Sequence, residues 1–190
     1  MRALFFLLPW LAGCALTSKA TPLDIRYFSP EIGLAHHADP PGEAARPRVR
    51  LGRLTSSANL RYRIVHRESP VETGEYETLR WTENPEAYVR RSLVAALFSD
   101  RLEQATGGGA PTLDVEVVSF EEVHRESYHG GRVGLRFQLT DQRSVLLSDV
   151  VVIERGATGP GFGSVVVAIG AAMDATTAQV ATAVSARMAR

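Results

Sequence analysis

Cys14, the one cysteine of the chain, is the residue with the clearest prospect of chemistry. It ends the run Leu11-Ala12-Gly13-Cys14, and Arg2 and the apolar residues 3–8 precede that run. A positive residue, a short apolar stretch and two small residues before a cysteine are typical of a bacterial lipoprotein signal. The pattern predicts cleavage before Cys14 and acylation of its thiol, so that two or three acyl chains would anchor the mature chain in a membrane.

The other explanation of this N-terminal run is a core helix that buries the cysteine thiol. Six apolar residues followed by Pro9 make a poor helix, and a membrane-spanning helix needs about 20 apolar residues. We therefore expect residues 1–13 to be a signal peptide and residues 14–22 to be a lipidated tether. Ala15 stands where an aspartate would favour the inner membrane, so we expect an anchor in the outer membrane that faces the periplasm.

A second group of reactive side chains crowds one later segment and could be assembled into a metal site. Its members are Glu121, Glu122, His124, Glu126 and His129. Their spacing matches no strong ligand pattern such as HExxH, and no cysteine assists them. Runs of charge are most often exposed to solvent, so the segment predicts a solvated hairpin that links two strands. We expect no metal ion there.

The run Gly159-Pro160-Gly161-Phe162-Gly163-Ser164 could be taken for a phosphate-binding loop. It lacks the Lys-Ser/Thr pair of a P-loop, and Pro160 removes a backbone donor that a phosphate cradle would use. A connection between a strand and a helix explains it without a ligand. Since there is also no G-x-S-x-G motif, we expect no catalytic residue, no cofactor and no enzymatic activity.

Length and composition indicate one ordinary globular domain. The chain has 190 residues, of which 45% are hydrophobic and 22% are charged, and this fits a single domain over residues 23–190. Basic and acidic residues balance at 21 each, which argues against nucleic acid as a partner because such binding draws on clustered Lys and Arg. A single cysteine excludes an internal disulfide.

Several segments show the apolar alternation of half-buried strands. They are centred on Ile25 and Tyr27, Val49 and Leu51, Leu60 to Ile64, Tyr76 to Trp81, Leu113 to Val117, Val133 to Leu139, and Val145 to Ile153.

Two helices are expected. The first has Asn84 as its N-cap and Pro85 at its first position, and its apolar stripe continues to Arg101-Leu102 before Gly107-Gly108-Gly109 stops it. The second covers residues 164–188 and is rich in alanine, which allows close packing on a sheet. Strands and helices that mix in this way predict an α/β domain with a mixed β-sheet packed against two main helices.

Three aromatic residues lie near the first helix, namely Tyr76, Trp81 and Tyr88. They could form a docking surface for a partner. Aromatic residues are common in cores as well as in interfaces, and we favour a buried junction between strand and helix.

Together these residues resemble the ABC-type transport auxiliary lipoprotein family. The likeness rests on the Cys14 signal, on Tyr27-Phe28-Ser29-Pro30, on Leu60-Arg61-Tyr62-Arg63, and on Trp81-Thr82-Glu83-Asn84-Pro85 at the start of a helix. It covers most of the mature chain. The resemblance implies a fold similar to the N-terminal domain of TolB, with no catalytic motif, so Cys14 is the one functional residue carried over.

The resemblance also implies a role. Members of this family are outer-membrane lipoproteins of MCE-type lipid transport systems, so we expect a non-enzymatic component that docks the MCE-domain periplasmic protein of an ABC transport system at the outer membrane. A homo-oligomer that matches the symmetry of the MCE partner is compatible with this role. The alternative is a periplasmic lipoprotein that binds a lipid or small apolar ligand in its own pocket, and a hydrolase ranks third.

Overall fold

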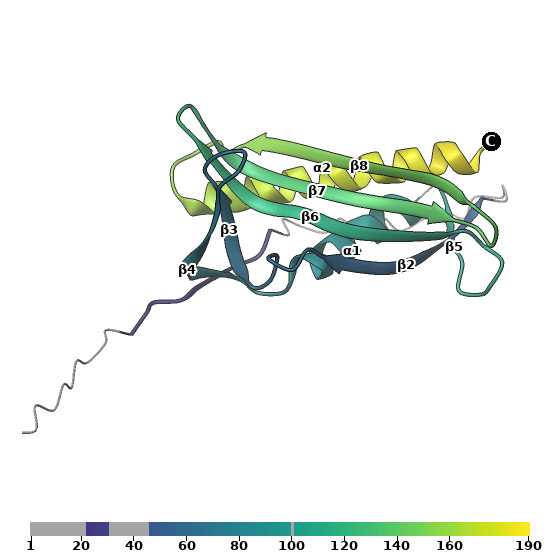
Figure 1. Cartoon of the computed structure of the whole chain (residues 1–190), viewed down its shortest axis with the longest axis horizontal. Helices are drawn as coiled ribbons and strands as arrows, with labels where there is room; N and C mark the ends of the chain where they lie inside the picture. The colour runs from purple at the N-terminus through teal and green to yellow at the C-terminus, as the bar shows by residue number, and fades with distance from the viewer. Residues whose placement is uncertain (1–21, 31–45, 100) are drawn as a thin grey trace, which may run out of the picture.

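The computed structural model describes residues 22–30, 46–99 and 101–190 (Figure 1). This part of the chain forms eight strands and two helices. The strands are β1 (Arg26–Phe28), β2 (Arg48–Ser56), β3 (Arg63–Arg67), β4 (Thr73–Trp81), β5 (Glu103–Gln104), β6 (Thr112–Arg125), β7 (Tyr128–Thr140) and β8 (Val145–Gly156). The helices are α1 (Pro85–Phe98) and α2 (Phe162–Met188).

The sheet is built around β6. Along one edge β6 pairs over its whole length with antiparallel β7, which pairs in turn with antiparallel β8. Along its other edge β6 pairs first with β2 and then with β3, and both run parallel to it. Antiparallel β4 follows β3, while β1 and β5 add parallel strands beside β4 and β2. The result is one mixed sheet of eight strands, which confirms the predicted fold class.

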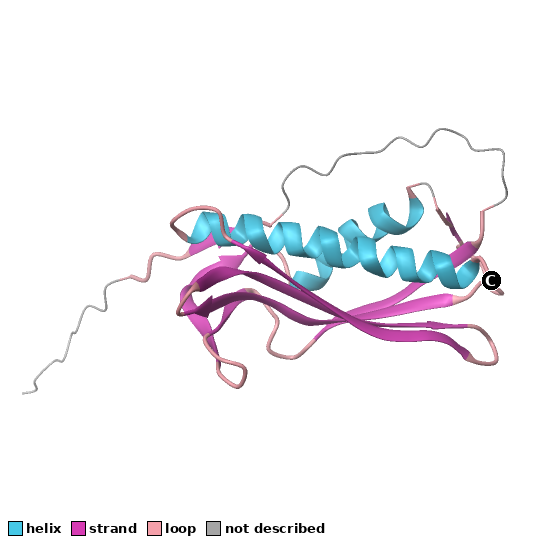
Figure 2. Cartoon of the chain, turned by 90° about the horizontal axis from the view of Figure 1, so that it is seen from above, coloured by secondary structure: helices cyan, strands magenta, loops and turns pink. Residues whose placement is uncertain are grey.

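Both helices lie on the same side of this sheet (Figure 2). Helix α2 packs along β7 and β8, and α1 packs beside α2 and against β2 and β6. We call the covered side the helix face and the other side the open face, since among the described residues no helix covers it. Residues at even and odd positions of a strand point to opposite faces, so each strand here has an apolar side toward the helices.

The helix face carries the core. On β7 the alternating residues Val133, Leu135, Phe137 and Leu139 are all buried, as the strict period of two predicts. Near α1, the rings of Trp81 and Phe120 lie 5.3 Å apart, and Tyr88 stacks on Phe120 at 6.3 Å. Trp81 and Tyr88 are fully buried, which confirms a core junction rather than a docking surface for these two.

Gly131 of β7 lets α2 approach the sheet closely. A Cβ atom at this position would lie 2.4 Å from the backbone nitrogen of Ile169, a separation that real Cβ atoms do not show. The contact also fixes the faces of β7, because it places Gly131 on the helix face and its neighbours Arg132 and Gly130 on the other side of the pleat.

Helix α2 is long and apolar enough to cross a membrane by length and composition. Most of its apolar window is buried against the sheet and α1, so here it is a core helix. Its buried stripe includes Met173, Thr177, Val180 and Val184, the positions that the sequence predicts. Both the type and the extent of this helix are therefore confirmed.

The predicted end of the first helix is wrong. Helix α1 ends at Phe98, and the chain then turns so that Leu102 is buried and residues 103–104 pair with β2. Leu102 continues the apolar spacing of the helix, although its side chain reaches the core from a turn. The glycines at 107–109 lie in the connection between β5 and β6 and do not stop α1.

The strand predicted from Leu60 to Ile64 is shorter than expected. Only its last part belongs to β3, which begins at Arg63. Leu60 donates its backbone N–H to the carbonyl oxygen of Ser57 in a turn and buries its side chain there. The turn is needed because β2 and β3 pair one after the other with the same edge of β6.

Candidate functional site

Cys14, the predicted lipidation site, lies outside the described residues, as does the boundary between the predicted signal peptide and tether. The described chain begins at residue 22 and leads into β1. In Figure 1 this purple segment lies at one end of the elongated domain, and the C-terminus lies at the opposite end. The fold therefore presents its N-terminal side at one end of its long axis.

The acidic and histidine-rich segment forms the end of the β6–β7 hairpin, where His124 lies opposite His129. This confirms the predicted hairpin between two strands. The prediction that its first two glutamates are exposed to solvent is wrong, because Glu121 and Glu122 are only 1% and 2% exposed. The two residues are adjacent in β6, so their side chains point to opposite faces of the sheet.

Glu121 lies on the open face and is enclosed by arginines. Its Oε1 is 2.7 Å from Nε of Arg67 and 3.8 Å from Nε of Arg132. Arg132 also approaches Glu154 at 3.7 Å, and Arg125 binds Glu154 at 2.9 Å. These ion pairs give the buried carboxylate partners of opposite charge and cover the β3, β6 and β7 strands with long side chains.

Glu122 lies on the helix face and has uncharged or titratable partners. It accepts a hydrogen bond from the Tyr76 hydroxyl and contacts Nε2 of His129. Burial raises the pKa of Tyr76 strongly, and the Glu122 carboxylate adds to that rise through its hydrogen bond and its charge. His66 packs on Tyr76 with ring centroids 4.7 Å apart.

In a hydrolase with a catalytic triad, a carboxylate orients an imidazole as Glu122 contacts His129 here. Such a site also needs a nucleophile beside the imidazole. Among the described residues no serine, threonine or cysteine is hydrogen-bonded to His129. No group of three or more His, Cys, Asp or Glu side chains in that part of the chain could hold a metal ion. Within the described residues the cluster is a polar network that is buried at Glu122 and exposed to solvent at His129.

The glycine-rich loop before α2 uses its own polar groups. Gly161 takes a φ of 86° at the helix N-cap, a conformation that favours glycine. The Ser164 hydroxyl donates to the backbone carbonyl oxygens of Gly159 and Gly161 and so closes the loop on itself. The segment connects β8 to α2, as the sequence predicts.

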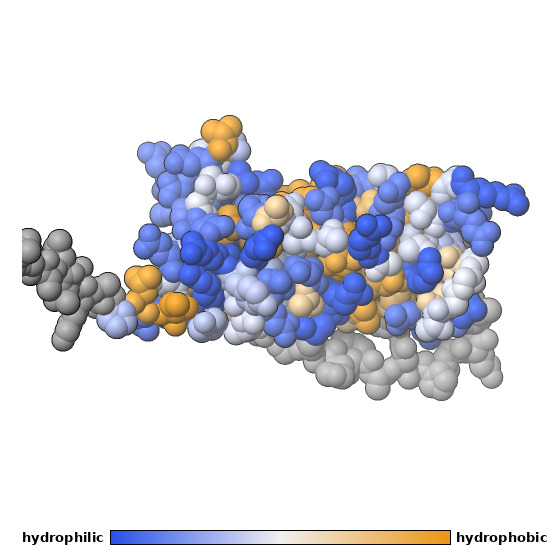
Figure 3. All heavy atoms as spheres, turned by 60° about the horizontal axis from the view of Figure 1, so that its bottom comes forward, coloured by the Kyte–Doolittle hydropathy of each residue, from blue (hydrophilic) through white to orange (hydrophobic). Residues whose placement is uncertain are grey.

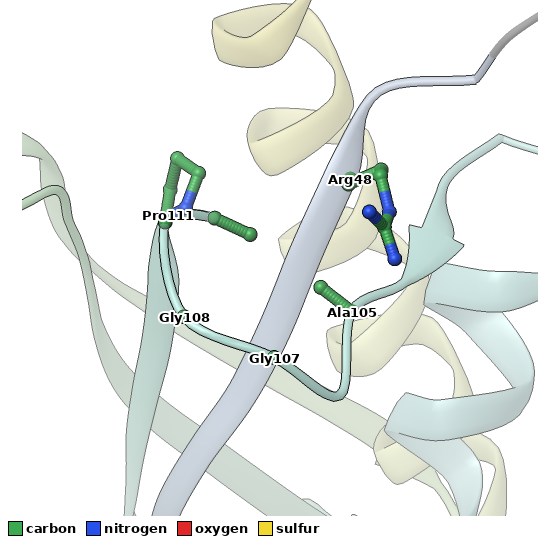
Figure 4. A pocket seen from close by; sticks show the side chains of 7 residues that line it. Arg48, Ala105, Gly107, Gly108 and Pro111 are labelled. Carbon is green, nitrogen blue, oxygen red and sulfur yellow. The ribbon is translucent and has the colours of Figure 1, made fainter.

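Two of the surface hollows in the described part of the chain are similar in volume. One of about 320 Å³ is lined by Arg48, Ala105, the glycines at 107–109, Ala110 and Pro111 (Figure 4). Its charged residue, Arg48, is already paired with Glu103 at 3.1 Å. The other, of about 310 Å³, lies between the β2–β3 turn and the start of α1. Neither is an enclosed apolar cavity, and the space between the helices and the sheet is filled by the core.

The open face and the edge of β8 that does not pair with β7 form an unpartnered surface in the described part of the chain. Val150 and Val152 are about half exposed there, and the Glu116–Arg136 pair at 2.7 Å lies beside them. The edge itself is partly closed. The Asp149 carboxylate accepts from the Val150 N–H at 2.7 Å, and Arg187 of α2 donates to the Leu146 carbonyl oxygen at 2.8 Å.

The sequence matches no family model and no curated protein. Solved structures are similar in fold. Protein XCC0632 from Xanthomonas campestris, of the family DUF330, shares 16% identity over 85% of this chain and 96% of its own, with a TM-score of 0.69. Hypothetical protein CT253 from Chlamydia trachomatis shares 11% identity over 76% of this chain and 98% of its own, with a TM-score of 0.56. These likenesses show the fold alone.

Proposed function

We propose that this chain is a lipid-anchored periplasmic component of an ABC/MCE-type intermembrane lipid transport system that docks the MCE-domain protein at the outer membrane. Acyl chains on Cys14 would hold it in the membrane, and the folded domain would bind the partner. The role is positional and needs no chemistry at the domain. The Trp81-Thr82-Glu83-Asn84-Pro85 helix start and the other residues of the family resemblance support it.

One observation carries the proposal. The predicted lipoprotein signal ends at Cys14, and it precedes a domain whose first strand, β1, lies at one end of its long axis (Figure 1). A chain that enters the fold at an end leaves the rest of the domain pointing away from its anchor. Such a domain can hold a partner at a fixed distance from the membrane.

The open face supports this role as the surface for a partner. Exposed apolar side chains at Val150 and Val152 alternate with polar neighbours along β8, and ion pairs flank them. Interfaces between proteins that also exist apart combine apolar and polar groups in this way. A homo-oligomer would use the same surface or the blunted edge of β8.

The alternative function, a carrier of a lipid or small apolar ligand, needs an apolar pocket of several hundred Å³. Within the described residues the space between helices and sheet is occupied by core side chains such as Val165, Ile169 and Leu135. The structure thus offers no specific observation that favours this alternative.

Two measurements test the proposal. Mass spectrometry of the protein from its native host should show residues 1–13 absent and Cys14 acylated, while Cys14→Ala should leave an unprocessed or mislocalised chain.

The acylated chain in detergent should then co-purify with the periplasmic part of an MCE protein encoded beside it. The double variant V150D/V152D should weaken this binding, and Val145→Asp at the far end of β8 serves as the matched control. An unmodified, soluble mature protein, or a chain that recovers no MCE partner, would contradict the proposal.

A further inference from the structure

The start of the described chain carries an exposed apolar patch. Leu23, Ile25 and Tyr27 are 62%, 43% and 64% exposed, and they occupy alternate positions leading into and along β1. The intervening side of β1 is packed, since the ring of Phe28 lies 5.0 Å from that of Phe162 in α2. Tyr27, the neighbour of Phe28 in β1, therefore points to the opposite face of the sheet, and Leu23 and Ile25 are exposed in the segment before the strand. We call these three residues the N-terminal patch.

Aromatic and basic side chains continue the N-terminal patch across the sheet. Tyr27 of β1 lies opposite Arg80 of β4, and Arg80 lies opposite Arg63 of β3. Figure 3 shows apolar side chains gathered at this end of the molecule, where the described chain begins.

The charges around the N-terminal patch are mixed. Asp24 and Arg26 alternate with its residues along the chain, and across the sheet Arg63 approaches Glu75 at 3.5 Å. Tyrosine together with arginine is the combination found at the boundary between lipid headgroups and water.

The position of the predicted anchor makes a bilayer the nearest large surface. Leu23 is nine positions after Cys14, and each step spans at most about 3.5 Å, so the N-terminal patch begins within about 32 Å of an acylated cysteine. A tether this short keeps the patch at a high effective concentration next to the membrane. Weak contacts, which would not bind a free domain, are then sufficient.

We propose that the N-terminal patch rests in the headgroup region of the membrane that holds the acyl chains and sets the orientation of the domain. This inference rests on the proposed lipid anchor. Leu23 and Ile25 would lose water from apolar surface, Tyr27 would place its ring at the interface, and the nearby arginines would approach anionic headgroups. The long axis would then lead away from the membrane, with the Val145 end in the periplasm.

Site-directed spin labelling can test this contact, because acylation leaves the chain without a free thiol. Ile25→Cys and Val145→Cys would each carry one nitroxide on the acylated full chain, in vesicles of phosphatidylethanolamine with a minority of phosphatidylglycerol. Val145 is the matched control, an apolar residue of similar exposure, 54%, at the opposite end of the domain. Collision with oxygen reports lipid, and collision with a water-soluble nickel chelate reports water.

We expect the ratio of oxygen to chelate accessibility to be several-fold higher at position 25 than at position 145. Adding L23S and Y27S should bring the ratio at position 25 close to that at position 145, whereas V150S/V152S on the open face should leave it unchanged. Equal ratios at the two positions on a chain that still floats with vesicles would overturn the membrane contact and leave the anchor standing. Shielding of position 25 from both reagents would show a protein cover and also overturn it. A free Cys14 on a chain that does not float would overturn both proposals.

Discussion

Glu121 and Glu122 are neighbours in β6, and the two faces of the sheet accommodate them by different means. On the open face, Glu121 binds the guanidinium groups of Arg67 and Arg132, whose long side chains reach it from strands and keep contact with water. On the helix face, Glu122 is enclosed beneath α2 and binds the hydroxyl of Tyr76 and the ring of His129. The two partner sets differ because adjacent residues of a strand point to opposite faces of the sheet and so meet different strands' side chains.

The same difference governs how tightly the faces are packed. The helix face excludes even a methyl group at Gly131, where α2 lies against β7. The open face meets mainly side chains that can move. Substitutions of one kind should therefore cost much more on the helix face than on the open face, and the predictions below test this difference.

The largest effect is expected from a charge placed under the helices. Leu97 of α1 is fully buried, so Leu97→Asp should lower the free energy of unfolding by about 3–5 kcal/mol through an unpaired buried charge. The matched variant Val150→Asp adds the same charge to the open face and should cost less than about 1 kcal/mol. Urea unfolding of both variants measures the difference. Equal losses would show that the face of α1 containing Leu97 is not core.

Gly131→Ala is expected to be the next most costly change. The new Cβ would meet the backbone of Ile169, so α2 must shift, at about 1–3 kcal/mol. The control is Gly134→Ala on the same strand, whose Cβ would first meet the Ser119 hydroxyl at 2.5 Å on the open face, a side chain that can rotate. Thermal unfolding should separate the two variants, and a smaller loss for Gly131→Ala would contradict the tight contact.

Removal of the charge on Glu121 should have an intermediate effect. Glu121→Gln leaves Arg67 and Arg132 without their carboxylate, and we expect a loss of about 2 kcal/mol because both arginines keep some contact with solvent. Glu154→Gln removes a more exposed partner and should cost less than about 1 kcal/mol. Urea unfolding at low and high salt is the measurement. A loss at Glu121 no greater than that at Glu154 would mean that burial adds nothing to this network.

These partners also show where the sequence stops being informative. Helix α2 and strand β7 could be predicted because their own apolar spacing faces one core along their whole length. The partner of Glu121 could not, because Arg67 is 54 residues away and is brought to it by the parallel pairing of β3 with β6. A weaker signal was present in Phe120 and Val123, whose apolar character shows that the strand continues past the glutamates.

The end of α1 was mispredicted for a similar reason. Leu102 lies four residues after Phe98, a helical interval, and local spacing alone cannot distinguish a helical leucine from one that a turn returns to the same core. The pairing of Glu103 and Gln104 with β2 decides the matter, and it is a contact between distant segments. Sequence thus predicts elements with their own periodicity and misses what long-range pairing imposes.

A smaller effect on stability is expected at alkaline pH. It depends on Tyr76, the hydroxyl partner of Glu122. The pKa of Tyr76 is raised in the folded state, so above about pH 10 the unfolded chain loses this proton before the folded one does. The stability that Tyr76 contributes is complete below that pH and declines above it. Tyr76→Phe should therefore flatten the alkaline fall of the free energy of unfolding, while Tyr128, whose pKa is also raised by burial, maintains part of it.

The control for this experiment is Tyr62→Phe, which removes a hydroxyl from an exposed ring and should leave the alkaline slope unchanged. Urea unfolding between neutral and strongly alkaline pH measures both variants. A slope for Tyr76→Phe identical to that of the unaltered protein would contradict the burial of this hydroxyl beside Glu122.

The smallest effect on stability is expected at the edge of β8, where the open face ends. Asp149 binds the outward N–H of Val150, so a strand from another molecule would have to displace this carboxylate before it could pair there. Asp149→Ala should change the free energy of unfolding by less than about 0.5 kcal/mol, because the side chain is exposed. It should nevertheless raise the tendency to self-associate, since it frees a backbone donor beside Val150 and Val152.

Analytical ultracentrifugation over a range of concentrations measures this self-association, with Ser148→Ala as the neighbouring control. Unchanged sedimentation of Asp149→Ala would mean that Arg187, bound to the Leu146 carbonyl oxygen, is sufficient to close the edge without the carboxylate.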